Sequence, residues 1–224
     1  MIMNQVLLTR ETIEVLGNFV QINPSIIVCA GSEIRSISNL EHILAKYKCT
    51  EVFPTEFAIY DLSEFLNVVS LFENPVLEFD NGQYVTIRSG SKYSKYYFSN
   101  PEITLKRAPN TDVKFPGADI QFGLSESDVK GIRKASNILN LEDINIASKD
   151  ETDVRVSLID TEDETNNTYE QVFQGCSTGD FSVNIKMENL VVLPGDYTLS
   201  ICAKGMSEWR DNNRDLVYYI GLEQ

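Results

Sequence analysis

The sequence predicts an α+β protein made of two similar halves, each with mostly antiparallel sheet and a few helices against one face. Most of the 224 residues fall in short segments rich in β-branched and aromatic residues, separated by turn signals such as DNG and PGD. Other segments carry apolar residues at three- and four-residue spacing, which is typical of helices. The motif LTRET at residues 8–12 also has a counterpart, LSESD, at 124–128, and each precedes a strand-rich stretch.

Two helices are predicted in the first half. The first covers residues 9–23, with Thr9 as N-cap and Pro24 directly after its end. Its apolar stripe comprises Ile13, Leu16, Phe19 and Val20. The second covers 61–72, with Asp61 as N-cap. Its stripe comprises Leu62, Phe65, Leu66 and Val69.

Two further helices are predicted in the second half. One covers residues 125–140, where Ser125 and Asp128 have the spacing of a capping box. Its buried face is formed by Val129, Ile132, Ser136 and Leu139. The other is short, residues 187–193, and ends before Pro194.

A connector separates the halves. Residues 100–119, NPEITLKRAPNTDVKFPGAD, contain three prolines and no clear periodicity. The predicted organisation is therefore a first domain over 1–100, a connector over 101–121 and a second domain over 122–224.

The charge is acidic overall but basic on one helix. The chain has 33 acidic residues against 19 Lys and Arg, a formal charge of −14. This balance argues against attachment to nucleic acid over the whole surface, because phosphate contacts need cations. On the helix over 125–140, however, one polar face gathers four residues at helical spacing: Lys130, Arg133, Lys134 and Asn137. A solvated helix face is the ordinary interpretation, and a local phosphate-facing site is the alternative.

No enzyme, cofactor or metal motif stands out. The chain lacks GxGxxG and GxxxxGK[ST] loops, and His42 has no Cys or Ser in a partnering context. The acidic run DTEDET at 160–165 lacks EF-hand spacing and is interpreted as a solvated loop. The widely spaced Cys29, Cys49, Cys176 and Cys202 are expected to be buried thiols. Neither a signal peptide nor a membrane span is predicted.

Three stretches resemble one family in order and spacing. FAIYDLSEFLNVVSLFENPVLEF (57–79), PGDYTLSICAKG (194–205) and LVYYIGLE (216–223) are similar to the DNA sliding clamps of T-even-type tailed bacteriophages, distant relatives of proliferating-cell nuclear antigen. The resemblance implies two tandem clamp domains per chain, each with two helices inside and antiparallel sheet outside. Three chains would close head to tail into a ring.

The resemblance also implies a function without catalysis. The ring would encircle duplex DNA, tether the replicative DNA polymerase and be opened by an ATP-dependent clamp loader. In T-even-type phages it would also serve late transcription. The expected location is the cytoplasm of the infected bacterial host. No cofactor and no membrane partner is implied.

Residue roles follow from the resemblance for the DNA-facing surface. It implies that Lys130, Arg133, Lys134 and Asn137 point at phosphate, with Arg10 added from the first helix. The first domain departs from the family, since Glu11, Glu14 and Gly17 stand where further lysines are usual, and the helix over 61–72 has no cation. A further basic group lies in the stretch RSGSKYSK and comprises Arg88, Lys92 and Lys95. It would either reach DNA from a loop or serve the subunit interface.

Two further surfaces are implied. A partner-peptide pocket would use Val113, Phe115 and Ile120 from the connector, with Tyr218, Tyr219 and Ile220 from the C-terminal strand. Each of these six could equally be a plain core residue. Subunits would join edge strand to edge strand. The interface candidates are Lys92, Lys95, Tyr96, Tyr97 and Phe98 from the first domain, and Tyr169, Val172 and Phe173 from the second.

Two other classes of function compete with the clamp. An acidic β-rich interaction protein, such as a DNA mimic, would share the charge of −14 but would not form a ring. A hydrolase using paired carboxylates is disfavoured, because no pair of acids stands in a recognisable cleft motif.

Overall fold

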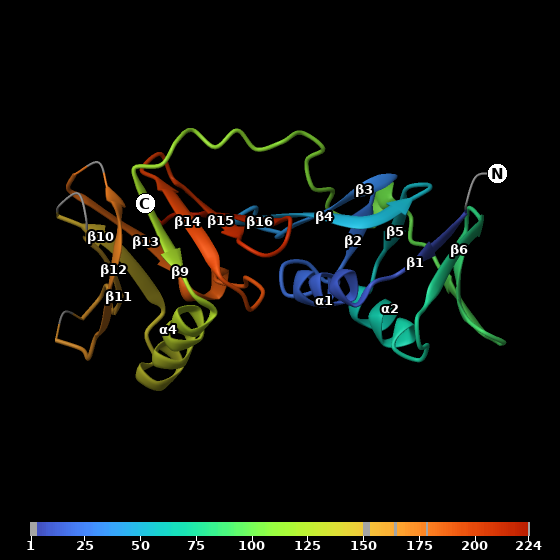
Figure 1. Ribbon diagram of the computed structural model, residues 1–224, viewed down its shortest axis with the longest axis horizontal. Helices are drawn as coiled ribbons and strands as arrows, with labels where there is room; N and C mark the ends of the chain where they lie inside the picture. The colour runs from blue at the N-terminus through green and yellow to red at the C-terminus, as the bar shows by residue number, and fades with distance from the viewer. Residues whose placement is uncertain (1–3, 150–152, 164, 178, 224) are drawn as a thin grey trace. The chain divides into compact units, whose positions relative to one another are not determined.

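The chain folds into two compact units, Met1–Thr111 and Asp112–Gln224 (Figure 1). The computed structural model describes residues 4–149, 153–163, 165–177 and 179–223. The division between the units falls within the segment predicted as the connector, and each unit contains its own helices and antiparallel strands.

The first unit contains one sheet and two separate strand pairs. The sheet has the order β1-β6-β7-β8, with antiparallel neighbours: β1 (Gln5–Leu7), β6 (Val76–Asn81), β7 (Tyr84–Ser89) and β8 (Lys92–Tyr97). The antiparallel pairs join β2 (Ile26–Val28) to β5 (Phe57–Ile59) and β3 (Gly31–Ile37) to β4 (Ile43–Phe53). The helices are α1 (Arg10–Phe19), α2 (Leu62–Val69) and the short α3 (Pro101–Thr104).

The second unit is built on antiparallel strands in the order β13-β10-β11-β12-β9-β14-β15-β16. Their bounds are β9 (Ile120–Leu124), β10 (Asp143–Ser148), β11 (Asp153–Ile159), β12 (Tyr169–Ser177), β13 (Phe181–Lys186), β14 (Tyr197–Cys202), β15 (Met206–Asp211) and β16 (Leu216–Gly221). The helix α4 (Glu126–Leu139) follows β9, and a single 3-10 turn, η1 (Met187–Asn189), follows β13.

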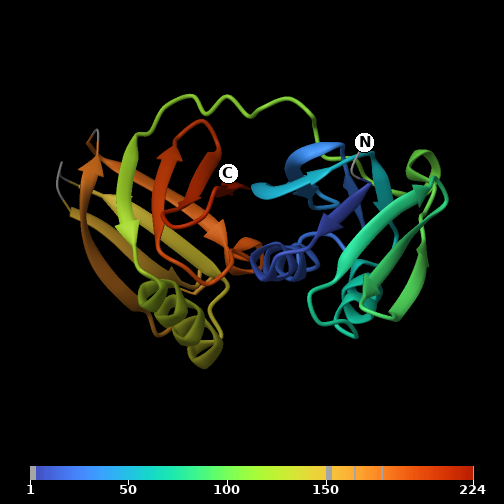
Figure 2. The same cartoon turned by 45° about the vertical axis from the view of Figure 1, so that its right-hand side comes forward.

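The helices α1 and α2 lie against the strands of the first unit (Figure 2), and their apolar side chains are buried in its core. Leu16 and Phe19 of α1 and Leu62 and Phe65 of α2 are buried. Burial of such side chains supplies most of the free energy of folding. The sequence prediction for α1 was partly wrong, because Ile13 and Val20 are only half-buried while Thr12 and Val15 are fully buried. The helix is rotated so that the hydroxyl of Thr12 can bind a buried carboxylate.

That carboxylate belongs to Glu51 on β4, and it holds the start of α1. Glu51 accepts hydrogen bonds from the backbone N–H of Thr9 at 2.7 Å and from the hydroxyl of Thr12 at 2.8 Å. Burial raises the pKa of the Glu51 carboxyl, but these hydrogen bonds outweigh burial and leave the pKa below its usual value. The ionised carboxylate therefore stabilises the N-terminus of α1.

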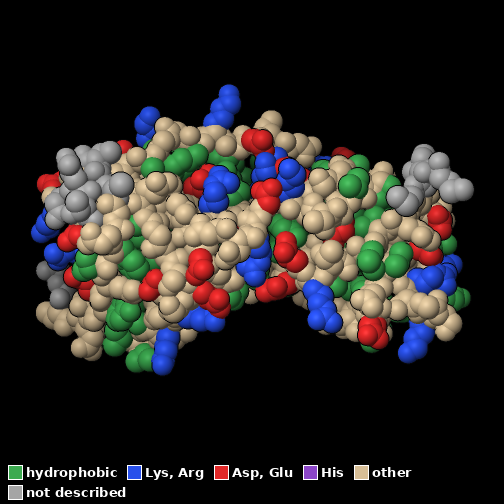
Figure 3. Space-filling model, viewed as in Figure 1, with side chains coloured by type: hydrophobic (Ala, Val, Ile, Leu, Met, Phe, Trp, Pro, Cys, Tyr) green, Lys and Arg blue, Asp and Glu red, His purple; other side chains and the backbone are tan. Residues whose placement is uncertain are grey.

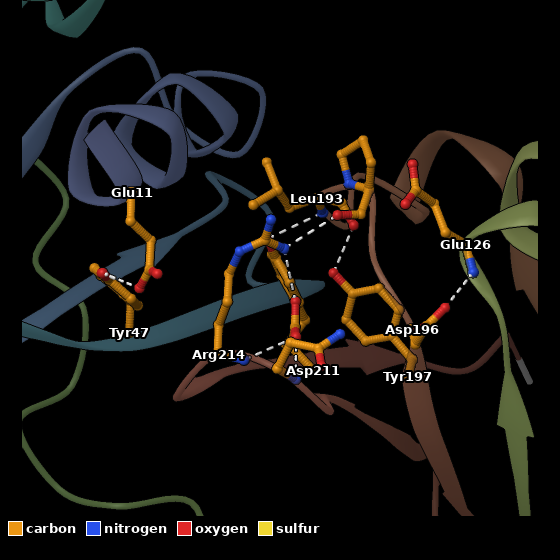
Figure 4. A network of polar contacts seen from close by, with 11 residues as sticks. Glu11, Tyr47, Glu126, Leu193, Asp196, Tyr197, Asp211 and Arg214 are labelled. Carbon is orange, nitrogen blue, oxygen red and sulfur yellow. Dashed lines mark hydrogen bonds and ion pairs between the residues drawn. The ribbon is translucent and has the colours of Figure 1, made fainter. Parts of the chain in front are cut away.

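The predicted helix over 187–193 was wrong beyond its first turn. After η1 the chain is irregular, since Pro194 cannot continue a helix and the β-branched Val191 and Val192 disfavour one. The second unit therefore has one α-helix, α4, among its described residues, where two were expected. The irregular segment is fixed by side chains: the hydroxyl of Tyr197 donates to the carbonyl of Leu193 at 2.6 Å (Figure 4).

We expect Glu51→Gln to destabilise the protein at pH 7 by about 1–3 kcal/mol, because the two donors bind different carboxylate oxygens and one of these oxygens becomes an NH2 donor. Since the pKa of Glu51 is lowered on folding, its contribution exists above the unfolded pKa of about 4.3 and is lost as pH falls through the folded pKa. The difference between wild type and variant should thus shrink on acidification. Urea unfolding followed by circular dichroism from pH 7 to pH 3 would measure it.

The matched control is Glu73→Gln, which changes an exposed carboxyl. Its stability should equal that of the wild type within about 0.5 kcal/mol at every pH. A Glu51→Gln penalty that stays constant down to pH 3 would contradict the assigned role of the carboxylate.

Candidate nucleic-acid interface

The N-terminus of α4 is fixed to the sheet by hydrogen bonds. Ser125 and Asp128 form the predicted capping box: the Asp128 backbone N–H donates to the Ser125 hydroxyl at 3.2 Å, and the Ser125 N–H donates to the Asp128 carboxylate at 2.9 Å. Gln171 of β12 also donates to Asp128, at 2.6 Å. Asp196 accepts from the backbone N–H of Glu126 at 2.8 Å (Figure 4). These contacts determine which face of α4 is exposed.

The exposed face of α4 carries two lysines. Val129, Ile132 and Ser136 are buried on the opposite face. Lys130, Lys134 and Asn137 are exposed, as the spacing predicted. Lys130 also pairs with Glu126 one turn earlier, so part of its charge is compensated. Lys134 follows it on the same face and adds a second cation.

Arg133 does not share this exposed face, and the expectation that it points at phosphate is corrected. Its Nη2 donates to the backbone carbonyls of Leu190, at 2.9 Å, and Val192, at 2.7 Å. Burial lowers the pKa of the guanidinium from its usual value. The physical reason is the missing second helix: the irregular segment after η1 leaves carbonyls without helical partners, and Arg133 supplies the donors.

The helices of the first unit add little positive charge. Arg10 is exposed at the start of α1, but Glu11 and Glu14 are exposed on the same helix. Glu11 accepts a hydrogen bond from the hydroxyl of Tyr47 at 2.7 Å. The exposed residues of α2 include Glu64 and no cation. Acidic and basic side chains are interspersed over the face of the molecule drawn in Figure 3.

The six residues predicted for a partner pocket fall into two classes. Val113, Phe115 and Tyr219 are half-buried. Ile120, Tyr218 and Ile220 are fully buried, and the hydroxyl of Tyr218 accepts from the backbone N–H of Leu193 at 3.1 Å. The second class can support a pocket, but only the first has surface that a ligand could contact.

Sequence reasoning missed three cations that hold the start of the connector on the first unit. Arg35 donates to the carbonyls of Pro109, at 2.7 Å, and Thr111, at 2.8 Å. Arg107 forms a bidentate pair with Glu56, both contacts at 2.8 Å. Lys106 donates to the carbonyl of Asn39 at 2.6 Å. The adjacent Lys106 and Arg107 in a proline-rich segment were a usable signal.

Each unit has a strand with an unpaired edge. β8 lies at the edge of its sheet and pairs only with β7 among the described strands. β12 pairs with β11 along Tyr169–Gln174, but it pairs with β9 only over Gly175–Ser177. Along Tyr169–Gln174 the second edge of β12 therefore has no strand beside it within the described parts of the chain.

Some of the subunit-interface candidates on β8 and β12 are exposed, whereas others contact residues of their own unit. Lys92, Lys95, Tyr97 and Val172 are exposed. The others have contacts within their own unit: Tyr96 lies 5.2 Å from Phe65, Phe98 lies 5.5 Å from Phe57 and Phe173 lies 5.3 Å from Phe122, all between ring centroids, and Tyr169 donates to Gln171 at 3.3 Å.

The remaining candidates give no second site. In the acidic loop, Asp160 and Asp163 accept backbone N–H groups of the loop itself, while Glu164 lies outside the described residues. No group of three metal-ligating side chains occurs in the part of the chain that is described, and His42 is exposed. Cys49 and Cys202 are buried free thiols and Cys29 is half-buried, whereas the side chain of Cys176 is not described. Among the described helices, none has the length and apolar character that a membrane crossing requires.

Solved structures support the same fold. The proliferating cellular nuclear antigen of Entamoeba histolytica superposes with a TM-score of 0.70 at 14% identity, covering 95% of this chain and 94% of its own. A chain from the structure of the C-terminal region of FEN-1 bound to A. fulgidus PCNA superposes with a TM-score of 0.72 at 12% identity, with 98% of each chain covered.

Sequence comparisons also identify the family to which the chain belongs. Residues 9–102 match the model of the DNA polymerase processivity factors. The sliding clamp of Vibrio phage KVP40 is 33% identical over 221 residues, covering 96% of this chain and 98% of its own length. The sliding clamp of Enterobacteria phage T4 is 27% identical, with 88% of each chain covered. The chain therefore belongs to the phage sliding clamps, a non-enzymatic family of DNA polymerase processivity factors.

Proposed function

We propose that three copies of this clamp close head to tail into a ring around duplex DNA and tether the replicative DNA polymerase. An ATP-dependent clamp loader would open the ring, and late-transcription factors would use the same ring in the cytoplasm of the infected host. The observation that carries the proposal is that both units have unpaired strand edges within the described residues, among them β8 and the Tyr169–Gln174 part of β12.

The two edges suit a contact between copies. An exposed strand edge presents unpaired N–H and C=O groups, which invite pairing with another strand. Because the edges differ, β8 of one copy would pair with β12 of the next, a heterologous contact that closes a ring at the right rotation. Val172 is 49% exposed on β12, so it offers apolar surface to such a contact.

The lysines of α4 suit sliding rather than tight binding. Lys130 and Lys134 stand on an exposed helix face, and contacts from lysine to phosphate are independent of sequence. A closed ring would hold DNA by topology, so weak contacts suffice. The net charge of −14 on the chain would disfavour DNA on other surfaces.

A partner peptide would bind beside the connector. Val113 and Phe115 are half-buried in its extended part and could receive apolar anchors from a polymerase or transcription-factor tail. A related fold supports this mode, since A. fulgidus PCNA has the C-terminal region of FEN-1 bound in its solved structure.

We expect the wild type to elute at three times 25.3 kDa in size exclusion with light scattering, and Val172→Asp to dissociate toward the monomer. A carboxylate on the β12 edge would be desolvated when a second strand pairs with it. Leu40→Asp is the matched control, because Leu40 is also strongly exposed but lies in the turn between β3 and β4. A wild type that stays monomeric at high concentration would contradict the ring and favour the acidic interaction protein.

We expect Lys130→Ala combined with Lys134→Ala to reduce the salt dependence of duplex binding, by about 0.9 in the log–log slope for each phosphate that is no longer neutralised. Duplex retention after loading, measured between about 50 and 200 mM salt, would test this. The trimer mass should be unchanged.

Arg133→Met is the contrasting variant. It should leave the salt slope unchanged and lower the free energy of unfolding by about 1.5–3 kcal/mol, because two backbone carbonyls lose a charged donor. If Arg133→Met lowers the slope as strongly as the lysine variant does, without loss of stability, Arg133 contacts DNA after all.

A further inference from the structure

The outer face of the β1-β6-β7-β8 sheet carries an unusual set of side chains. On β7, Val85 and Ile87 are fully buried toward the helices. Successive side chains of a strand point to opposite faces, so Tyr84 and Arg88 point outward. On β8, Tyr96 packs against Phe65 of α2, and the residues on either side of it in the strand point outward for the same reason. We define the tyrosine–cation face as Tyr84, Arg88, Tyr93, Lys95 and Tyr97.

Aromatic rings and cations are in contact across this face. The register places Tyr84 opposite Tyr97 and Arg88 opposite Tyr93. The rings of Tyr84 and Tyr97 lie 5.4 Å apart between centroids, and Nζ of Lys95 lies 4.6 Å from the Tyr84 centroid. Cζ of Arg88 lies 5.2 Å from the Tyr93 centroid. These contacts hold the cations beside the rings.

The face is exposed and carries two cations, Arg88 and Lys95. Tyr93 is 61% exposed and Tyr97 is 66% exposed, so two large rings meet water. Glu78 on the neighbouring strand β6 pairs with Arg88 at 3.1 Å and compensates its charge. Lys95 therefore leaves a positive charge on the face, although the chain as a whole carries −14.

The spacing of these groups fits a single strand of nucleic acid. Side chains two residues apart on a strand stand about 7 Å apart, so Tyr93, Lys95 and Tyr97 repeat aromatic, cation, aromatic along one row. Single-stranded nucleic acid is bound by aromatic rings that stack on bases and by cations that follow the phosphates. A duplex offers no free base faces to such a row, because its bases are already stacked.

We propose that the tyrosine–cation face binds single-stranded nucleic acid, with Tyr93 and Tyr97 stacking on bases and Lys95 contacting phosphates. The face uses side chains, whereas the strand pairing proposed for ring closure uses the backbone edge of β8. The site is therefore distinct from the duplex-facing lysines of α4 and does not depend on ring closure.

The test is fluorescence anisotropy of the full-length protein with labelled oligo(dT) and oligo(U) at low salt. We expect Tyr93→Ala combined with Tyr97→Ala to weaken binding by roughly 5- to 150-fold for each base that no longer stacks. Lys95→Ala should lower the log–log salt slope by about 0.7. Comparison of oligo(dT) with oligo(U) distinguishes a DNA strand from an RNA strand as the ligand.

Three controls show whether binding depends on the rings of this face. Tyr93→Phe with Tyr97→Phe keeps both rings and should bind like the wild type. Leu40→Ala removes another strongly exposed apolar side chain, in the turn between β3 and β4, and should have no effect. Lys134→Ala should weaken duplex binding but leave oligonucleotide binding unchanged.

Two results would overturn the proposal. One is wild-type protein that does not bind either oligonucleotide, which would leave the face to a protein partner with acidic side chains. The other is oligonucleotide binding that survives the double alanine variant but is lost with Lys134→Ala, which would place the strand at α4. Light scattering of each variant shows whether its assembly has changed. A loss of oligonucleotide binding caused by disassembly of the ring is thereby distinguished from one caused by loss of the tyrosine–cation face.

Discussion

The architecture depends on how the N-termini of the helices are satisfied. The first backbone N–H groups of a helix have no partner within the helix, and each buried one left unpaired costs free energy. In the second unit Asp128 and Asp196 bind N–H groups at the start of α4, and Gln171 joins Asp128 to β12. In the first unit Glu51 has the same role for α1. Each helix is thereby held in one rotation about its axis relative to the neighbouring strands. That rotation decides which side chains of the helix face solvent.

The two units fix the N-termini of their helices with different residues, and the charges exposed on these helices differ as a result. On α4, fixing Val129 and Ile132 in the core leaves Lys130 and Lys134 outside. On α1, the equivalent rotation leaves Glu11 and Glu14 outside beside Arg10. A duplicated fold therefore presents lysines on the helix of one copy and mainly acids on the other. If the ring forms as proposed, its inner surface would alternate in charge, which suits weak and mobile phosphate contacts better than a uniform basic lining.

Loss of a helix in the second unit has its own consequence. The irregular segment after η1 needs donors for its carbonyls, and Arg133 and Tyr197 supply them. One cation of the basic helix, Arg133, thus stabilises the fold through these hydrogen bonds. Its neighbours Lys130 and Lys134 lie on the outward side and are exposed, with Lys130 paired to Glu126. Adjacent cations of the same helix can therefore have unrelated roles, although their spacing in sequence looks uniform.

The sequence by itself determined the α+β class, the start of α2 and the limits of α4, because hydrophobic periodicity and capping residues are local signals. It also indicated the family through the ordered stretches at 57–79, 194–205 and 216–223. Tertiary structure alone decided that Arg133 turns inward and that Arg35 and Arg107 hold the connector. It also decided that Tyr84 and Arg88 meet Tyr97 and Tyr93 across two strands. These outcomes rest on contacts between residues distant in the chain, and periodicity within a segment carries no information about which distant donor meets which acceptor.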